Sequence, residues 1–291
     1  MRDGFPHPSQ AYPEPDTGRT PPKAGALLPW PAVRVVDLDR DMSDVIPTGT
    51  TRDSEYLFDR MTERTLALAC AGPGRRVLDC ASGFGQDAIA LAARGGSVVG
   101  AEPSARMTGW ARLVSAKAEG PVPAWVRAWS HSLPFATGSF DAVLCKGAID
   151  HFDRPARAIA EMARVTRPAG RVILAIANFE SLACRTARAL DALQEGLLGR
   201  TLPRGRRHYD VPADHFTRYD LGLMREQASR YLELDRVEGI SLLWGLPQWT
   251  RTVERLPYRC ASRALRGADW IARREPRLAD VVVLAGRPRP R

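Results

Sequence analysis

The stretch Val77-Leu78-Asp79-Cys80-Ala81-Ser82-Gly83-Phe84-Gly85-Gln86-Asp87-Ala88 joins an apolar segment to an alanine-rich one through two glycines. The residues Arg75 to Leu78 favour a β-strand, and Gln86 to Arg94 favour a short helix that Gly95 can end. A strand that turns through glycines into a helix directs backbone N–H groups beyond the strand end, and glycine lets a ligand approach closely. The turn therefore predicts a small-molecule site within an α/β fold.

The pattern Gly83-x-Gly85-x-x-Ala88 also fits enzymes that bind nicotinamide or flavin dinucleotides, so the glycines alone leave the ligand open. Asp79 at the strand end favours another ligand. A dinucleotide places its pyrophosphate at the helix N-terminus, where a neighbouring carboxylate would repel it. S-adenosylmethionine carries no phosphate but has a sulfonium and an ammonium group, and Asp79 suits the ammonium.

A second acid, Glu102, follows the apolar segment Ser97 to Ala101. One strand, helix and strand unit places this carboxylate beside the glycine turn, where it can accept both hydroxyls of a ribose. Ser104 is expected to cap the next helix. The apolar face of that helix is Met107, Trp110, Ala111 and Val114. Each acid alone fits a helix-capping or surface residue equally well, but together with the glycines they favour a nucleoside site.

Four stretches, in order, resemble the class I S-adenosylmethionine-dependent methyltransferases, in the branch of quinone-biosynthesis and small-molecule enzymes. They are residues 79–85, 99–107, 133–143 and 161–171, within a resemblance that covers roughly residues 50 to 240. The resemblance implies a Rossmann-like, doubly wound seven-stranded sheet with an antiparallel last strand and helical cap insertions. It also implies S-adenosyl-L-methionine as the cofactor.

The chain departs from the family pattern at two positions. Ala81 stands where a glycine is usual, which reduces the room for the methionine part of the cofactor. Trp129 stands where the family has an aspartate that meets the adenine amine. Ser130 or His131 is the candidate for the missing hydrogen bond, and Trp129 is a candidate to stack on the adenine.

The expected cofactor contacts combine the strand ends with the motifs of the family. They are Tyr56, Asp79, Ala81, Gly83, Gly85, Glu102, Pro103, Met107, Trp129, Ser130 and Lys146. Tyr56 belongs to a predicted helix from Arg52 to Ala71, which the resemblance places over the cofactor. Phe58 on the same helix fits packing on the sheet at least as well.

The candidate catalytic residues follow the fourth predicted strand, Phe140 to Cys145, whose continuous apolar character predicts burial on both faces. Ligands of open α/β sheets lie beyond the carboxyl ends of strands, so Asp150 and His151 are expected to face the transferred methyl group. His151 is the candidate base for an acceptor hydroxyl, with His215 as the alternative and Asp150 to orient either. A histidine that only shapes the pocket is the competing interpretation.

The chain divides into a methyltransferase core and additions. We expect a disordered Pro-rich N-terminus at 1–30, a lid segment at 31–72 and a cofactor-binding core at 73–178, continued at 216–240. Cap insertions are expected at 179–215 and 241–278, and the last strand with a basic tail at 279–291. The second insertion holds Trp244, Trp249 and Trp270, for which packing within the cap is favoured over ligand contact.

Composition narrows the class of protein. The 291 residues are 44% hydrophobic, enough for one large domain, and no run approaches the roughly 20 apolar residues that span a bilayer. The proline-rich start lacks an apolar signal core, so we expect a cytoplasmic protein with no stable membrane insertion. Five widely spaced cysteines without a C-x-x-C pair argue against a disulfide framework and a structural zinc site.

The formal charge of +9 does not by itself indicate a nucleic-acid partner, because the arginines are spread and no basic and aromatic platform is visible. The Asp and His residues of the 208–215 loop are expected to be solvated, and no metal is expected.

We therefore predict a methyltransferase that acts on an O, N or C atom of a small metabolite, cyclic or aromatic in type, and that can form a homodimer. The alternatives are a nicotinamide-dependent oxidoreductase with the same glycine turn, and a methyltransferase-fold binding module that has lost catalysis.

Overall fold

The computed structural model describes residues 50–199, 207, 209–210 and 215–290. The predictions for 1–30, and for the lid segment before residue 50, lie outside the described residues.

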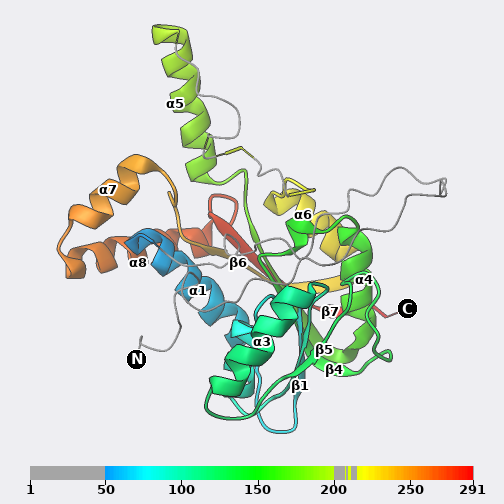
Figure 1. Ribbon diagram of the computed structural model, residues 1–291. Coiled ribbons are helices and arrows are strands. Elements are labelled where there is room, and N and C mark those ends of the chain that lie inside the picture. Colours follow the sequence, from blue (N-terminus) through cyan, green and yellow to red (C-terminus); the bar gives the residue numbers. More distant parts are fainter. Residues whose placement is uncertain (1–49, 200–206, 208, 211–214, 291) are drawn as a thin grey trace, which may run out of the picture.

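A seven-stranded sheet lies between helices on both faces (Figure 1). Its strands are β1 (Arg76–Cys80), β2 (Ser97–Ala101), β3 (Ala124–Val126), β4 (Phe140–Lys146), β5 (Thr166–Ala177), β6 (Leu232–Ile240) and β7 (Val281–Pro288). The helices are α1 (Arg52–Ala69), α2 (Gln86–Ala92), α3 (Ala105–Lys117), the 3-10 turn η3 (Ile149–His151), α4 (Pro155–Val165), α5 (Leu182–Leu198), α6 (Leu221–Ser229), α7 (Pro247–Arg255) and α8 (Tyr258–Arg274).

The strand order is β3-β2-β1-β4-β5-β7-β6, and β7 runs antiparallel to both β5 and β6. This confirms the predicted doubly wound sheet with an antiparallel last strand. The chain leaves β1 toward β2 on one side, while β4 pairs with β1 on the other, which makes β1 and β4 the switch point of the sheet. Asp79 pairs in register with Gly100 and Leu144, so the carboxyl ends of these three strands meet at one edge.

Two apolar cores lie on opposite faces of the sheet. On one face α4 and α6 pack through Ile159, Met162 and Met224. On the other face α1 and α2 pack through Leu57 and Leu91. The central strand β4 serves both cores, since Val143 and Cys145 face the first and Ala142 and Leu144 the second. The prediction that this strand is buried on both faces is confirmed.

The predicted cap of α3 is present, and α6 begins with a cap of the same kind. Ser104 Oγ accepts a hydrogen bond from the Met107 N–H at the start of α3, and Asp220 Oδ1 accepts one from the Leu223 N–H at the start of α6. Such caps satisfy donors that have no partner within the helix.

Two strands extend beyond their apolar segments. Strand β5 begins at Thr166, because Thr166 pairs with Phe140 ahead of an irregularity in the register. Strand β7 extends to Pro288, where Arg287 of the expected basic tail pairs in register with Glu233.

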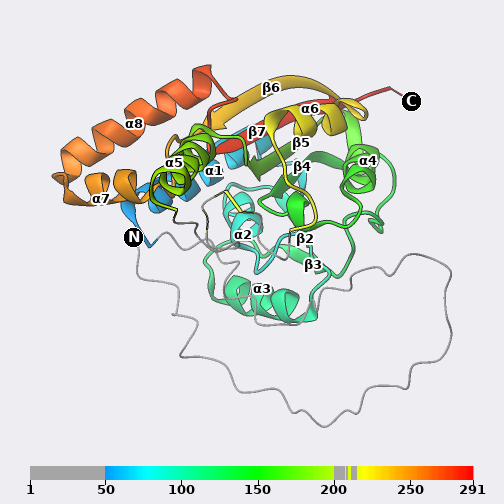
Figure 2. The ribbon, with the colours of Figure 1, turned by 90° about the horizontal axis from the view of Figure 1, so that it is seen from above.

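The two insertions differ in how they pack. Helix α5 projects from the body (Figure 1), and Leu190, Leu193 and Leu197 on it are 38%, 57% and 74% exposed. Helices α7 and α8 lie beside α1 at the far end of the sheet (Figure 2), and Val253, Ala261 and Leu265 form a small core between them. That they close an acceptor pocket stays a prediction. None of the described helices is long and apolar enough to cross a membrane.

Candidate active site

The glycine turn after β1 has the backbone that its sequence predicts. Gly83 and Gly85 have φ angles of +54° and +88°, in the region that favours glycine. A Cβ atom on Gly85 would lie 2.1 Å from the indole of Trp125, and one on Gly100 would lie 2.3 Å from it. Gly85 and Gly100 therefore also make room for a bulky side chain of β3. The sequence did not show this contact, because it depends on the register of three strands.

Asp79 is buried at the end of β1 and is 3% exposed. Its Oδ2 atom accepts no hydrogen bond from the described residues. Burial raises the pKa of the Asp79 carboxyl well above its usual value, Asp87 raises it further, and Lys146 acts in the opposite direction. A buried carboxylate oxygen that accepts no hydrogen bond suits a cationic donor such as an ammonium group.

Lys146, at the end of β4, contacts the two neighbouring helices. Its Nζ atom lies 2.7 Å from Asp87 Oδ1 on α2 and 2.8 Å from Thr62 Oγ1 on α1. The ammonium thus lowers the cost of burying Asp79 and Asp87 close together. Asp87 and Thr62 were not among the predicted site residues. Asp87 could have been predicted from its place inside the glycine stretch, whereas nothing in the sequence around Thr62 indicated a role.

Glu102 lies beside the turn, as its spacing predicted. Its carboxylate accepts hydrogen bonds from the N–H groups of Gly83 and Ser104, each at 3.0 Å. Burial raises the pKa of Glu102, and these two donors lower it. Met107 is buried, with its Cε atom 3.5 Å from the Cβ position of Gly83. The carbonyl of Pro103 accepts from Arg127.

The predicted adenine contacts lie after β3. Trp129 is 49% exposed and stacks on His131 at 5.8 Å between ring centroids. Ser130 is buried and hydrogen-bonds the thiol of Cys80, whose pKa is raised to about 12 by burial. Ala81 has a φ of +58°, a left-handed backbone in which glycine has no penalty.

Tyr56 lies apart from these residues. It packs against the small core of α7 and α8, and burial, followed by the nearby Asp269, raises the pKa of its hydroxyl. Its contact with a cofactor stays a prediction.

Asp150, His151 and His215 come together, although His215 lies in the segment between α5 and α6. His215 Nδ1 is 3.2 Å from Asp150 Oδ2, and His151 Nε2 is 3.9 Å from Asp150 Oδ1. The two imidazole rings meet edge to face with centroids 4.3 Å apart. The Asp150 side chain is 4% exposed, that of His215 14% and that of His151 31%, so His151 is the most accessible of the three.

Backbone hydrogen bonds hold His215 in this position. The N–H groups of Phe216 and Thr217 donate to the carbonyl of Asp150, at 2.8 and 3.2 Å. The ring of Phe179, just after β5, contacts the edge of His215 at 6.0 Å between centroids.

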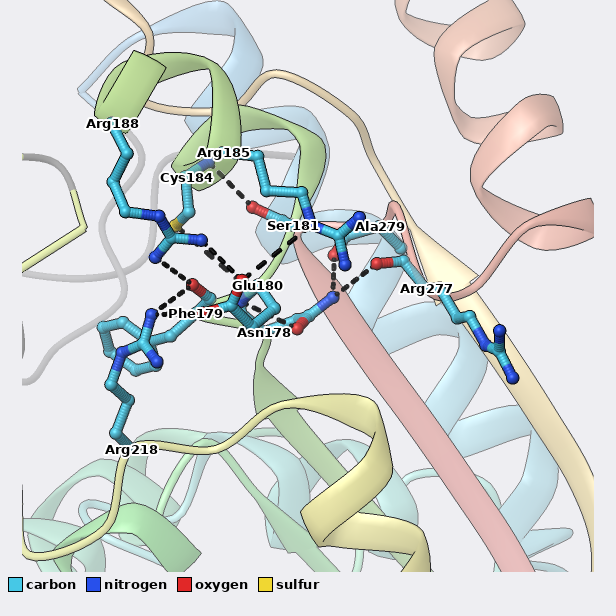
Figure 3. A network of polar contacts seen from close by, with 10 residues as sticks. All are labelled: Asn178, Phe179, Glu180, Ser181, Cys184, Arg185, Arg188, Arg218, Arg277 and Ala279. Atoms are coloured by element: carbon cyan, nitrogen blue, oxygen red, sulfur yellow. Dashed lines mark hydrogen bonds and ion pairs between the residues drawn. The ribbon is translucent and has the colours of Figure 1, made fainter. Parts of the chain in front are cut away.

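A cluster of arginines around Glu180 supports the same segment (Figure 3). Arg188 and Arg218 donate to the Glu180 carboxylate at 2.5 and 2.6 Å, and Arg218 also donates to the carbonyl of Phe179. Arg185 lies 3.9 Å from the same carboxylate. This network joins the end of β5, the start of α5 and the segment that carries His215. No pattern in the sequence predicted this network.

The two groups of residues flank one strand end. The pKa of the buried Cys145 thiol on β4 is raised well above its usual value, first by burial and then by Cys80, Asp79 and Asp150. Asp79 of the candidate cofactor site and Asp150 of the histidine cluster are therefore both near enough to Cys145 to raise the pKa of its thiol.

Residues 78–174 match the family model of the methyltransferase domain. Curated relatives include a demethylmenaquinone methyltransferase of Beutenbergia cavernae, 39% identical over 119 residues, which are 40% of this chain and 48% of the relative. Another, from Mycobacterium sp. strain KMS, is 37% identical over 147 residues, 50% of this chain and 59% of the relative. The chain spans about half the length of the curated relatives it matches.

Solved structures show the same fold. The magnesium protoporphyrin IX methyltransferase of Synechocystis, with bound SAH, has a TM-score of 0.55 at 16% identity and covers 84% of this chain and 90% of its own. The [4+2]-cyclase SpnF has a TM-score of 0.53 at 20% identity and covers 80% of each chain. Residues 78–174 thus match a methyltransferase domain, and the sheet that contains them has the fold of these solved structures.

Proposed function

We propose that the protein transfers a methyl group from S-adenosylmethionine to an oxygen, nitrogen or carbon atom of a small-molecule acceptor. The observation that carries the proposal is the pair of buried acids, Asp79 and Glu102, that flank the glycine turn at the ends of two adjacent parallel strands. Fold alone does not establish the reaction, because one fold can serve different chemistries.

The cofactor fits this strand edge by charge. Asp79, whose buried Oδ2 atom has no hydrogen-bond donor among the described residues, would accept the ammonium group. Glu102, fixed by two backbone N–H groups, would accept the ribose hydroxyls. S-adenosylmethionine supplies an activated methyl group on its sulfonium. The site has little chemistry left to perform beyond holding the acceptor close and aligned.

The acceptor side is assigned to Asp150, His151 and His215. A hydroxyl acceptor must lose its proton, and an imidazole titrates in the range needed to take it. His151 is the most exposed of the three and is the group that an acceptor reaches first. His215 is the alternative base, and Asp150 orients the imidazoles.

The acceptor class follows from the relatives. Two curated relatives are named demethylmenaquinone methyltransferases, which supports a cyclic or aromatic, quinone-like acceptor in a biosynthetic pathway. The site residues named here all come from one chain. A homodimer and a cytoplasmic location remain predictions, to be tested by light scattering of the purified protein and by cell fractionation.

The direct test is an acceptor screen. The full chain is incubated with S-adenosylmethionine and a panel of quinols, phenols and aromatic acids, and the products are analysed by mass spectrometry. We expect one acceptor to gain the mass of one CH₂ group while S-adenosylhomocysteine forms in equal amount, and Asp79→Asn to reduce both. Conversion of an acceptor without S-adenosylhomocysteine formation would contradict the proposal.

A further inference from the structure

Asp150 carries a buried oxygen that the fold leaves unsatisfied. Asp150 is 3% exposed, and its Oδ1 atom accepts no hydrogen bond from the described residues. A buried carboxylate oxygen that accepts no hydrogen bond is costly, so such an atom points to a missing ligand. The backbone of Asp150 is fixed, since its carbonyl accepts from Phe216 and Thr217. The carboxylate is therefore held in place beside His215.

Three side chains that can bind a metal ion come together at this oxygen. One atom from each of Asp150, His151 and His215 lies within 4.8 Å of the others. Within the set, His215 Nδ1 is 3.2 Å and His151 Nε2 is 3.9 Å from the carboxylate. An ion bound about 2.1 Å from each ligand needs ligands roughly 3 to 3.5 Å apart. The contact between His215 and Asp150 already has this spacing, and His151 would have to move closer to complete the set.

The types of ligand select the class of metal. Two imidazole nitrogens and one carboxylate suit a divalent transition ion such as Zn²⁺, whereas Mg²⁺ prefers oxygen ligands only. Three protein ligands leave a coordination position open, as in catalytic zinc sites. His151 has the most exposed side chain, so the open position would face the side from which an acceptor arrives.

We propose that Asp150, His151 and His215 bind one divalent transition-metal ion. Its role rests on the proposed methyl transfer. An acceptor hydroxyl bound at the open position becomes more acidic, its proton leaves to water, and its oxygen keeps the electron pair. His151 is then a ligand and not the base itself. The sequence-based expectation was that no metal binds, argued from the cysteines and from the 208–215 loop. The proposal departs from it, because two of these three ligands follow β4.

The test is calorimetric titration of Zn²⁺ into the full, untagged chain after dialysis against a chelator. We expect one ion per chain and much weaker binding of Mg²⁺. Asp150→Asn and His151→Gln should each lower the Zn²⁺ affinity by more than about 100-fold, since even outer-shell changes cost 10- to 100-fold. His131→Gln is the matched control, because His131 also lies near a carboxylate, 3.7 Å from Asp153, and should bind zinc as the wild type does.

Two outcomes would overturn the proposal. One is no stoichiometric binding, and the other is undiminished binding in both Asp150→Asn and His151→Gln while circular dichroism shows them folded. The double variant Cys70→Ser, Cys260→Ser removes the two exposed thiols and should retain the site, so loss of zinc there would also contradict it. The titration needs neither acceptor nor cofactor. Its failure leaves the methyltransferase proposal standing, and failure of the acceptor screen leaves the metal proposal standing.

Discussion

His215 Nδ1 lies 3.2 Å from Asp150 Oδ2, and the next two residues after His215 donate backbone hydrogen bonds to the carbonyl of Asp150. The first cap insertion is thereby fixed to the 3-10 turn that follows β4. The histidine cluster is thus assembled from two segments. A change in the segment that carries His215 should therefore alter the positions of the cluster's side chains.

Glu180→Gln tests this coupling. The substitution weakens the contacts with Arg188 and Arg218 that support the His215 segment. We expect turnover to fall about 3- to 10-fold with cofactor affinity unchanged, a loss that corresponds to about 1 kcal/mol, as for partly exposed ion pairs. Hydrogen exchange of the amides in 215–219 should become faster. Glu226→Gln, which removes an exposed pair with Arg230 on α6, is the control. Equal exchange and turnover in the two variants would refute the coupling.

His151→Gln separates the acceptor side from the cofactor side. Loss of its imidazole should lower turnover by about 10²- to 10⁴-fold, the usual contribution of a group that promotes proton removal. The affinity for S-adenosylhomocysteine should stay within about twofold, because His151 lies with Asp150 and not with Asp79. Single-turnover kinetics and calorimetry measure the two quantities. Unchanged turnover would remove His151 from the mechanism.

Ala81→Gly should stabilise the protein. Ala81 has a φ of +58°, a conformation that costs an alanine about 1 to 2 kcal/mol. Glycine avoids this cost, but it loses roughly 0.5 to 1 kcal/mol because its unfolded chain has more conformational freedom. The free energy of unfolding, measured with urea, should therefore rise by up to about 1.5 kcal/mol. Ala93→Gly is the matched control, because Ala93 is exposed with a φ of −59° and the same change should destabilise there. The same sign in both variants would argue against strain at Ala81.

Asp280→Asn should alter how stability depends on pH. Asp280 is 4% exposed, accepts from the Trp244 N–H, and has its pKa raised to about 7, chiefly by burial. The folded state therefore holds this proton more tightly than the unfolded state, so the wild type loses stability as pH rises from about 4 to about 7. Asn at this position cannot titrate, so the variant does not lose stability in this way. The loss in the wild type is at most about 4 kcal/mol. The stability of the variant relative to wild type should rise across that range.

Urea denaturation at several pH values measures the effect. The control is Asp235→Asn, whose parent carboxylate is 42% exposed and pairs with Arg171. A flat difference between Asp280→Asn and wild type from pH 4 to 8 would show that Asp280 titrates normally.

The doubly wound sheet was predicted through the family resemblance, whereas local patterns were sufficient to predict that Asp79, Glu102 and the glycine turn lie close together. The segment from Gly85 to Glu102 spans one helix and one strand, α2 and β2, which fixes where the second acid lies. The caps Ser104 and Asp220 depend on neighbours three residues away, so they too could be read from the sequence.

Contacts between distant segments could not be predicted in this way. Trp125 fills the space over Gly85 and Gly100 only once three strands are aligned. Lys146 meets Asp87 and Thr62 because β4 lies against α1 and α2. The sequence named Asp150, His151 and His215 individually, but their spacing as a possible ligand set became visible only in three dimensions.

The most direct test of the central claim is calorimetry of the full chain with S-adenosylhomocysteine and, separately, with NAD. The account predicts one tight site for S-adenosylhomocysteine and none for NAD. Asp79→Asn and Glu102→Ala should each weaken that site by about 10- to 100-fold, as expected for lost hydrogen bonds to buried charged groups. Tight binding of NAD with no heat from S-adenosylhomocysteine would contradict it.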